Sequence, residues 1–283
     1  YVEHGNQYDR FCSFEHVLDP TLGGQSELED PIAHQTFRAF ARQIAPTCDL
    51  HAIDHWKLPD FARWLAGLGP RLIGRLFVTY LGSVRWMLAT RRRLLRLARE
   101  THERHAVGLR ELATRVGLDH QVVQQLHSLR ERPAGRRLYH GLRMLYLDHL
   151  VAVLLALVVV LGVQLSPLDA VTRGELTTAV GGAALLVMGC LLALRDVSPV
   201  PKLSRAARRI REVLPVRYVV FGHSHVPTAE RLGHSSVYYN TGSWTGDSGG
   251  GLTHLCILRD EPRAELRRWC TTREAPVSAE GVW

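Results

Sequence analysis

Hydrophobic positions toward the end of the chain follow a strand pattern. Residues 218–221 and 237–240 are short apolar runs, and residues 228–232, 252–259 and 264–270 are short stretches that mix apolar and polar residues. Glycine, proline or polar residues separate these stretches. Runs of this length between turn-forming residues predict successive β-strands. Residues 202–214 instead carry apolar side chains at helical spacing, which predicts an amphipathic helix before the first strand. Pro199 and Pro201 are expected to form a linker ahead of that helix.

Two long apolar runs lie in the middle of the chain. Residues 150–168 and 176–194 are each 19 residues without a charge. At ~1.5 Å per residue, a helix of this length nearly crosses a hydrocarbon core of ~30 Å. Soluble core helices seldom stay uncharged on every face for so long, so the pattern favours a membrane hairpin with a link at residues 166–175 over a buried soluble hairpin.

Positive charge is concentrated before this hairpin. The chain has a net charge of +8, yet residues 63–143 alone contain 17 arginines against 5 acidic residues, a difference of +12. Arginines that alternate with apolar residues at helical spacing predict a basic amphipathic helical region suited to an anionic membrane surface. The alternative is a soluble helical insertion with an arginine-rich outer face. Basic residues flank both ends of the hairpin while the link holds Arg173, which predicts that both flanks are cytoplasmic.

Cysteine usage and isolated histidine pairs add little chemistry. The five cysteines are scattered without close pairs, which argues for a reducing compartment and against a disulfide framework or a cysteine-type zinc site. His51, Asp54 and His55, like His102 and His105, have helical spacings that could bind zinc. A solvated helix face is the commoner reason for such spacings.

The candidate chemistry lies at the two ends of the chain. His223 and His225 follow the predicted strand 218–221 after Gly222, and in an extended loop residues two apart point the same way. Both imidazoles would then converge, and imidazole is the commonest neutral metal ligand near pH 7. A third histidine, His4, precedes a glycine and a short polar loop, and the run Asn-Thr-Gly-Ser-Trp at 240–244 ends another predicted strand.

Together these stretches resemble a known family. His-Gly-Asn at 4–6, Gly-His-Ser-His at 222–225 and Asn-Thr-Gly-Ser-Trp at 240–244 look like the last three signatures of the calcineurin-like metallophosphoesterases. The most similar branch is bacterial, that of the UDP-diacylglucosamine hydrolases. The resemblance implies a centre of two divalent metal ions, with His4 and His223 on one ion and His225 on the other.

The resemblance also implies supporting residues and a choice of metal. Asp9 is expected to orient a metal-bound histidine, and Asn240, Thr241 and Ser243 are expected to support the ligand loop. The alternative for Asp9 is an ordinary charge on a surface loop. The alternative for Asn240, Thr241 and Ser243 is a polar β-turn without a role in the site. Imidazole together with carboxylate suits Mn²⁺, Fe²⁺ or Zn²⁺ better than Mg²⁺.

The first three signatures of the family do not occur ahead of His4. They are Asp-x-His, Gly-Asp-x-x-Asp and Gly-Asn-His-Asp/Glu, and they supply the bridging carboxylate and the catalytic histidine. The chain begins at Tyr1 inside a predicted strand, so we expect a fragment without its N-terminal half, or alternatively a degenerate relative. The catalytic residues are then unknown, and residues 1–283 alone are expected to show little hydrolysis.

The expected fold is α+β, a partial metallophosphoesterase β-sandwich with a helical insertion and a two-helix transmembrane hairpin. The expected divisions are a first core part at 1–62, a basic insertion at 63–148, the hairpin at 149–195 and the rest of the core at 196–283. The expected protein is a multi-pass phosphoesterase of the bacterial cytoplasmic membrane with its core on the cytoplasmic side. Its expected substrate is a phosphate mono- or diester. Its expected partners are lipids of the inner leaflet. Two alternatives stay open, a non-catalytic membrane protein with a binding module and, less favoured, a nucleic-acid phosphodiesterase.

Overall fold

A computed structural model describes most of the chain. It covers residues 1–18, 31–48, 58–134, 138–144, 146–194, 198–243, 252–258, 263–270 and 275–278. The chain forms two compact units, residues 1–136 with 198–283, and residues 137–197. The set His51, Asp54 and His55 lies outside the described residues.

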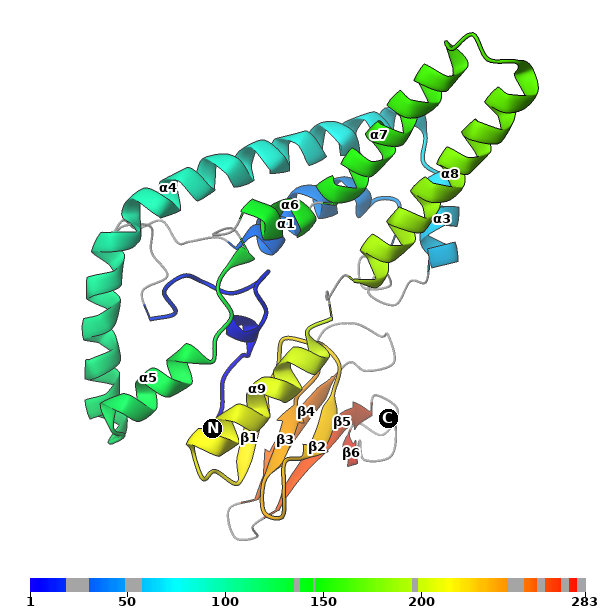
Figure 1. The fold of residues 1–283 in the computed structure, drawn as a ribbon. Coiled ribbons are helices and arrows are strands. Elements are labelled where there is room, and N and C mark those ends of the chain that lie inside the picture. Colours follow the sequence, from blue (N-terminus) through cyan, green and yellow to red (C-terminus); the bar gives the residue numbers. More distant parts are fainter. Residues whose placement is uncertain are drawn as a thin grey trace. The chain divides into compact units, whose positions relative to one another are not determined.

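The arginine-rich part of the first unit is helical, as expected (Figure 1). A short 3₁₀ helix η1 (Asn6–Tyr8) is followed by α1 (Ile32–Ile44), α3 (Leu58–Ala66), α4 (Pro70–Val116) and α5 (His120–Ser128). Proline fits the first turn of α4 because its missing N–H needs no partner there. The helix ends where Gly117 adopts φ 68°, and Asp119 then caps α5 by accepting a hydrogen bond from the amide of Gln121.

The second unit is a helical hairpin with a short preceding helix. It contains α6 (Leu138–Met144), α7 (Leu147–Gln164) and α8 (Ala170–Ala193). Both α7 and α8 are long and apolar enough to cross a membrane, and neither is buried within the structure. The link is shorter than expected because Asp169 caps α8, accepting hydrogen bonds from the amides of Val171 and Thr172.

Helix α9 (Val200–Val213) covers one face of a three-stranded sheet. Its first turn includes Pro201, so the expected proline linker is instead the start of the helix. In the sheet, β3 (Val237–Asn240) lies between β1 (Tyr218–Phe221), which is parallel to it, and β2 (Thr228–Arg231), which is antiparallel. The core between the helix and the sheet contains these buried side chains: Leu203, Ala206, Ala207, Ile210, Val219, Phe221 and Tyr238.

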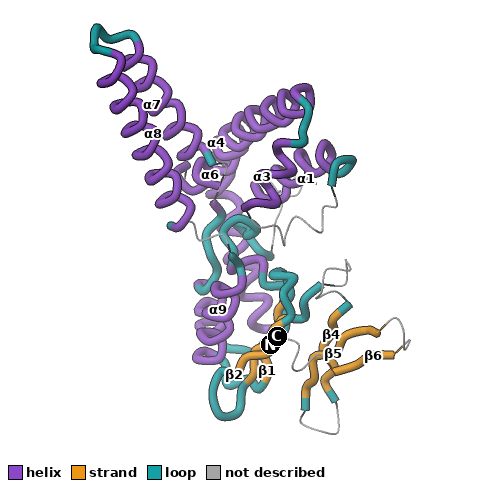
Figure 2. Tube along the Cα trace, turned by 90° about the vertical axis from the view of Figure 1, so that its right-hand side faces the viewer, coloured by secondary structure: helices purple, strands orange, loops and turns teal. Residues whose placement is uncertain are grey.

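The opposite face of this sheet packs against a second small sheet (Figure 2). The second sheet has the order β4 (Thr253–Ile257), β5 (Ala264–Cys270), β6 (Ala275–Ser278) and is antiparallel. Because side chains alternate along a strand, Tyr238 faces α9 while Tyr239 joins Ala264 and Leu266 in the other core. The Tyr239 hydroxyl also donates a hydrogen bond of 2.9 Å to the carbonyl of Ala264. The fold is therefore mixed α+β with small sheets, and this confirms the expected α+β class.

Candidate metal centre

His4 and His223 lie side by side although they belong to opposite ends of the chain. The segment before His4 runs along β1, where Val2 forms a parallel bridge with Val220. The amide of Gly222 then donates a hydrogen bond of 3.0 Å to the carbonyl of His4. The two imidazole rings are consequently 5.4 Å apart between centroids and nearly edge to face, at 66°.

Gly5 allows the chain to turn sharply after His4. It has φ 94°, and a Cβ at this position would lie 3.0 Å from Leu203 Cδ2 and 3.3 Å from Phe221 Cβ. Glycine suits both the backbone angle and the close approach. Helix η1 begins directly after it, and its end delivers Asp9 to the same place as His223.

Asp9 connects this turn to His223 and to α9. One carboxylate oxygen lies 3.3 Å from His223 Nε2, and the other lies 3.6 Å from the ammonium of Lys202. Burial alone would raise the pKa of the Asp9 carboxyl, but the hydrogen bond with His223 and the charge of Lys202 outweigh it and lower that pKa. An ionised carboxylate accepts hydrogen bonds, so His223 Nε2 is the donor in this contact and its Nδ1 faces away from Asp9.

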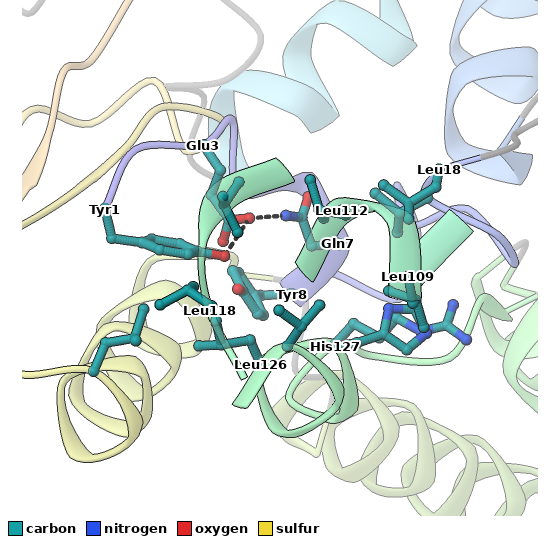
Figure 3. Close-up of a pocket in the computed structure, with 15 residues that line it drawn as sticks. Tyr1, Glu3, Gln7, Tyr8, Leu18, Leu109, Leu112, Leu118, Leu126 and His127 are labelled. Atoms are coloured by element: carbon teal, nitrogen blue, oxygen red, sulfur yellow. Dashed lines mark hydrogen bonds between the residues drawn. The ribbon is translucent and has the colours of Figure 1, made fainter. Parts of the chain in front are cut away.

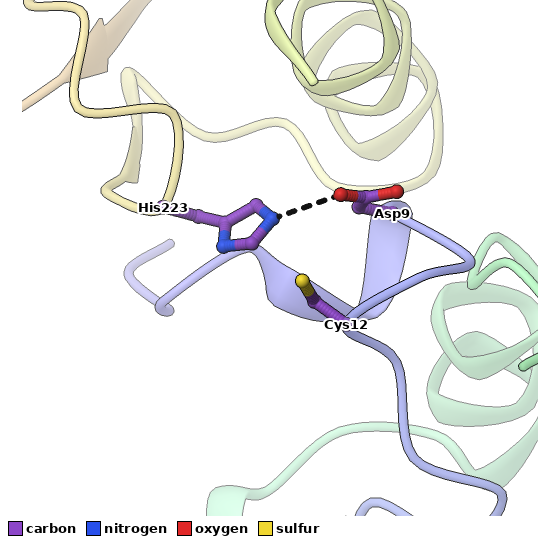
Figure 4. Close-up of side chains that lie close together, drawn as sticks. All are labelled: Asp9, Cys12 and His223. Atoms are coloured by element: carbon purple, nitrogen blue, oxygen red, sulfur yellow. Dashed lines mark hydrogen bonds and ion pairs between the residues drawn. The ribbon is translucent and has the colours of Figure 1, made fainter. Parts of the chain in front are cut away.

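Cys12 completes a three-residue cluster (Figure 4). The amide of Cys12 bonds the carbonyl of Asp9 in a tight turn, and one ligand atom each from Asp9, Cys12 and His223 lie within 4.8 Å of one another. Burial and the adjacent Asp9 carboxylate raise the pKa of the Cys12 thiol to about 12. The thiol is therefore protonated at neutral pH, and a bound cation would favour its thiolate.

His225 does not join this cluster. The loop after β1 is not extended as expected, because His223 and His225 have φ values of 64° and 57°. His225 is exposed, and across the described residues it has no hydrogen bond or ring contact with His4, Asp9 or His223. The assumption that side chains two apart point the same way therefore fails for this loop.

Asn240, Thr241 and Ser243 lie behind the histidine loop. The Asn240 side chain is fully buried and donates a hydrogen bond to the carbonyl of Gly222, while its oxygen accepts one from the amide of Gly242. Thr241 bonds Phe221 through the backbone, and the carbonyl of Ser243 accepts from the amide of Thr253. The contacts of Asn240 and Thr241 hold the backbone at Phe221 and Gly222, directly before His223.

Sequence reasoning missed two residues of this site, Cys12 and Lys202. Lys202 is buried in the first turn of α9, and its ammonium also lies 5.4 Å from the centre of the Phe11 ring. A signal for it was present, because Lys202 is one of only two lysines in a chain that otherwise uses arginine. Cys12 carried no comparable signal, because nothing in its spacing relates it to residue 223.

A separate apolar cavity of about 320 Å³ lies near the N-terminal segment (Figure 3). Leucines and valines of α4 and α5 line it, together with Tyr1, Glu3, Gln7 and Tyr8. Burial raises the pKa of the Glu3 carboxyl, which accepts hydrogen bonds from Tyr1 and Gln7. His4, Asp9, Cys12 and His223 are not among the lining residues, so this cavity is not the metal cluster.

We compared the chain with protein-family models, with curated proteins and with solved structures, and none of the three comparisons returned a match.

Proposed function

We propose that this chain carries part of the metal centre of a membrane-anchored metallophosphoesterase, which hydrolyses a phosphate mono- or diester. The observation that supports the proposal is the meeting of His4, Asp9 and His223 from segments more than two hundred residues apart. Two of the sequence signatures that resemble this family, at 4–6 and 222–225, contain His4 and His223. The packing of the two small sheets is compatible with part of the family's sandwich.

The donor set fits a borderline divalent ion. His223 and Cys12, which lie beside Asp9, and the adjacent imidazole of His4 together suit Zn²⁺ or Fe²⁺, and without the thiol also Mn²⁺. His225, exposed on the same loop, would serve a second ion. When bound, such ions supply charge neutralisation at the phosphate and lower the pKa of a water molecule.

The protein's own residues would orient and hold this site. Asp9 fixes the ring of His223 and leaves Nδ1 for coordination, an arrangement in which a carboxylate orients a histidine ligand. Lys202 favours the ionised form of Asp9, and Asn240 holds the loop backbone through Gly222. These contacts would keep the ligands in one geometry and reduce the reorganisation that binding requires.

The two apolar helices and the arginines suggest where the site works. We propose that α7 and α8 cross the cytoplasmic membrane and that the flanking basic residues remain in the cytoplasm. A site tethered beside the inner leaflet would favour an amphiphilic phosphate or diphosphate as substrate. Phosphate lipids in vesicles should then be hydrolysed faster than soluble nucleotides by the gene's complete product, and equal rates would contradict this preference.

Metal binding provides the direct test of the centre. The chain in detergent is titrated with Mn²⁺ and with Zn²⁺, and the His4→Gln and His223→Gln variants are compared with His34→Gln, which changes an exposed histidine on α1. We expect the first two variants to bind at least about tenfold more weakly and the control to bind normally. Unchanged affinity in both site variants would reject the proposal.

Hydrolysis separates the enzyme from the alternatives. The gene's complete product is assayed with Mn²⁺ and a chromogenic phosphodiester. Metal binding without hydrolysis would favour a non-catalytic binding module. Salt-sensitive binding to DNA in preference to anionic vesicles would favour a nucleic-acid phosphodiesterase.

A further inference from the structure

A second group of histidines lies outside the candidate centre. His16 belongs to the N-terminal segment, His102 and His105 to α4, and His127 to α5. The ring centroid of His105 lies 5.0 Å from that of His16 and 4.6 Å from that of His127, and the His16 and His102 centroids are 6.2 Å apart. Three segments of the chain thus bring their imidazoles to one place.

The closest pair has a separation that suits metal coordination. His105 Nε2 and His127 Nε2 are 3.1 Å apart. Two neutral imidazoles can share a proton at this distance, one as donor and the other as acceptor. Two nitrogens that each bind one tetrahedral ion at ~2.0–2.1 Å have a similar separation, a little over 3 Å.

Two of these imidazoles lie away from solvent. His105 and His16 are 3% and 6% exposed, and His127 is half-buried. Burial, the charge of Arg130 and the neighbouring histidines together lower the pKa of His127 to about 4. The group is therefore built largely inside the fold and not on its surface.

We propose that His105 and His127 bind a divalent ion of the Zn²⁺ class, with the neighbouring His16 and, at the exposed edge, His102 as further ligands. An all-imidazole donor set favours Zn²⁺, Ni²⁺ or Cu²⁺ over Mg²⁺, Ca²⁺ or Mn²⁺. The ion would tie α4 and α5 to the N-terminal segment that carries Asp9 and Cys12. Its role is thus structural, and it is independent of the phosphoesterase proposal.

Arg130 is the charged group that opposes binding. Its guanidinium donates hydrogen bonds to the carbonyls of Phe14 and Glu15, which lie next to His16. These contacts direct part of its charge to backbone oxygens, and they fix the segment from which His16 projects. Removal of this charge, as in Arg130→Gln, would favour the ion but would also loosen the segment, so Arg130 is left unchanged in the test.

Co²⁺ is a suitable probe because a tetrahedral nitrogen site gives it a strong visible spectrum. The full chain in detergent is titrated with Co²⁺ alone, and His105→Gln/His127→Gln is compared with His4→Gln/His223→Gln and with the exposed control His234→Gln. We expect the first double variant to lose the imidazole-type spectrum, which the other two retain. An unchanged spectrum in His105→Gln/His127→Gln overturns the proposal.

Thermal unfolding supplies a second measurement. Zn²⁺ that binds the folded chain raises its unfolding temperature, and this increase should be smaller in His105→Gln/His127→Gln than in the unsubstituted chain. If that variant fails to fold without metal, the single variant His16→Gln, which leaves the His105–His127 pair intact, replaces it. A full Zn²⁺-induced increase in the folded variant would likewise overturn the proposal, whatever the result at His4 and His223.

Discussion

The imidazole of His223 and the carboxylate of Asp9 lie 3.3 Å apart although 214 positions separate these residues in the sequence. The contact exists because the N-terminal segment runs beside β1 and turns at Gly5 toward the end of that strand. The site therefore forms only when both ends of the chain are folded together. Its energetics can be tested through the residues that surround Asp9.

The ion pair between Asp9 and Lys202 is buried, so removal of one partner should be costly. The Asp9→Asn variant leaves the ammonium of Lys202 with a neutral amide in place of its carboxylate, and we expect a loss of about 3 kcal/mol in the free energy of unfolding. Urea unfolding in detergent measures this loss. Adding Lys202→Met should restore part of the stability, and strictly additive losses would contradict a coupled pair.

Two glycines with similar backbone angles should respond differently to alanine. Gly242 has φ 71° and Gly117 has φ 68°, so each substitution costs ~1–2 kcal/mol in backbone strain. A Cβ at Gly242 would also clash with Thr253 Oγ1, whereas a Cβ at Gly117 meets nothing within 4 Å. We expect Gly242→Ala to be less stable than Gly117→Ala by a further ~1–3 kcal/mol in chemical unfolding. Equal losses would contradict the close contact.

Glu230 links β2 to α9 and should make stability depend on pH. It accepts hydrogen bonds from Ser204 Oγ at 2.5 Å and Arg208 Nε at 3.0 Å. Burial would raise the pKa of Glu230, but the bond from Ser204 and the charge of Arg208 together lower it.

Because the folded pKa is lowered, the stabilisation is complete above the ordinary glutamate pKa of ~4.3 and disappears as the pH falls through the folded value. Glu230→Gln should be less stable than the unsubstituted chain by under about 1 kcal/mol at pH 7, since Arg208 is largely exposed. The two proteins should converge in unfolding experiments at low pH. A difference that persists or grows in acid would be inconsistent with this linkage.

The Tyr239 hydroxyl is a polar link between the two sheets. Tyr239→Phe would leave the carbonyl of Ala264 without this donor, and we expect a loss of about 1 kcal/mol in the free energy of unfolding. The aromatic packing with Ala264 and Leu266 remains in the variant. Unaltered stability on urea unfolding would show that water replaces the hydroxyl.

The sequence predicted the elements whose pattern is local. Strands β1, β3 and β5 begin and end where expected, because each is a short stretch between turn-forming or polar residues. Strand β6 was missed because it is an edge strand that contains Pro276, which a central strand would exclude. The first turn of α8 was assigned to the link because it contains Arg173 and Glu175.

The candidate centre was predicted less completely, because its contacts are not local. Similarity to known signatures related His4 to His223, and the two rings are adjacent. No spacing rule relates Cys12 or Lys202 to residue 223, since the turn after Asp9 and the first turn of α9 meet only in three dimensions. The predicted geometry at His225 was wrong, because the prediction assumed an extended loop and the backbone there is left-handed.

The left-handed backbone at His223 and His225 lowers the stability of the loop that carries these two histidines. Such angles cost a non-glycine residue ~1–2 kcal/mol, a cost that evolution tolerates mainly where the side chain has a task. Glycine at position 225 would remove this strain at an exposed site, so the variant should unfold at higher urea concentration than the unsubstituted chain. A histidine at such a position lowers the stability of its own fold, and position 225 thus presents an exposed imidazole at a conformational cost.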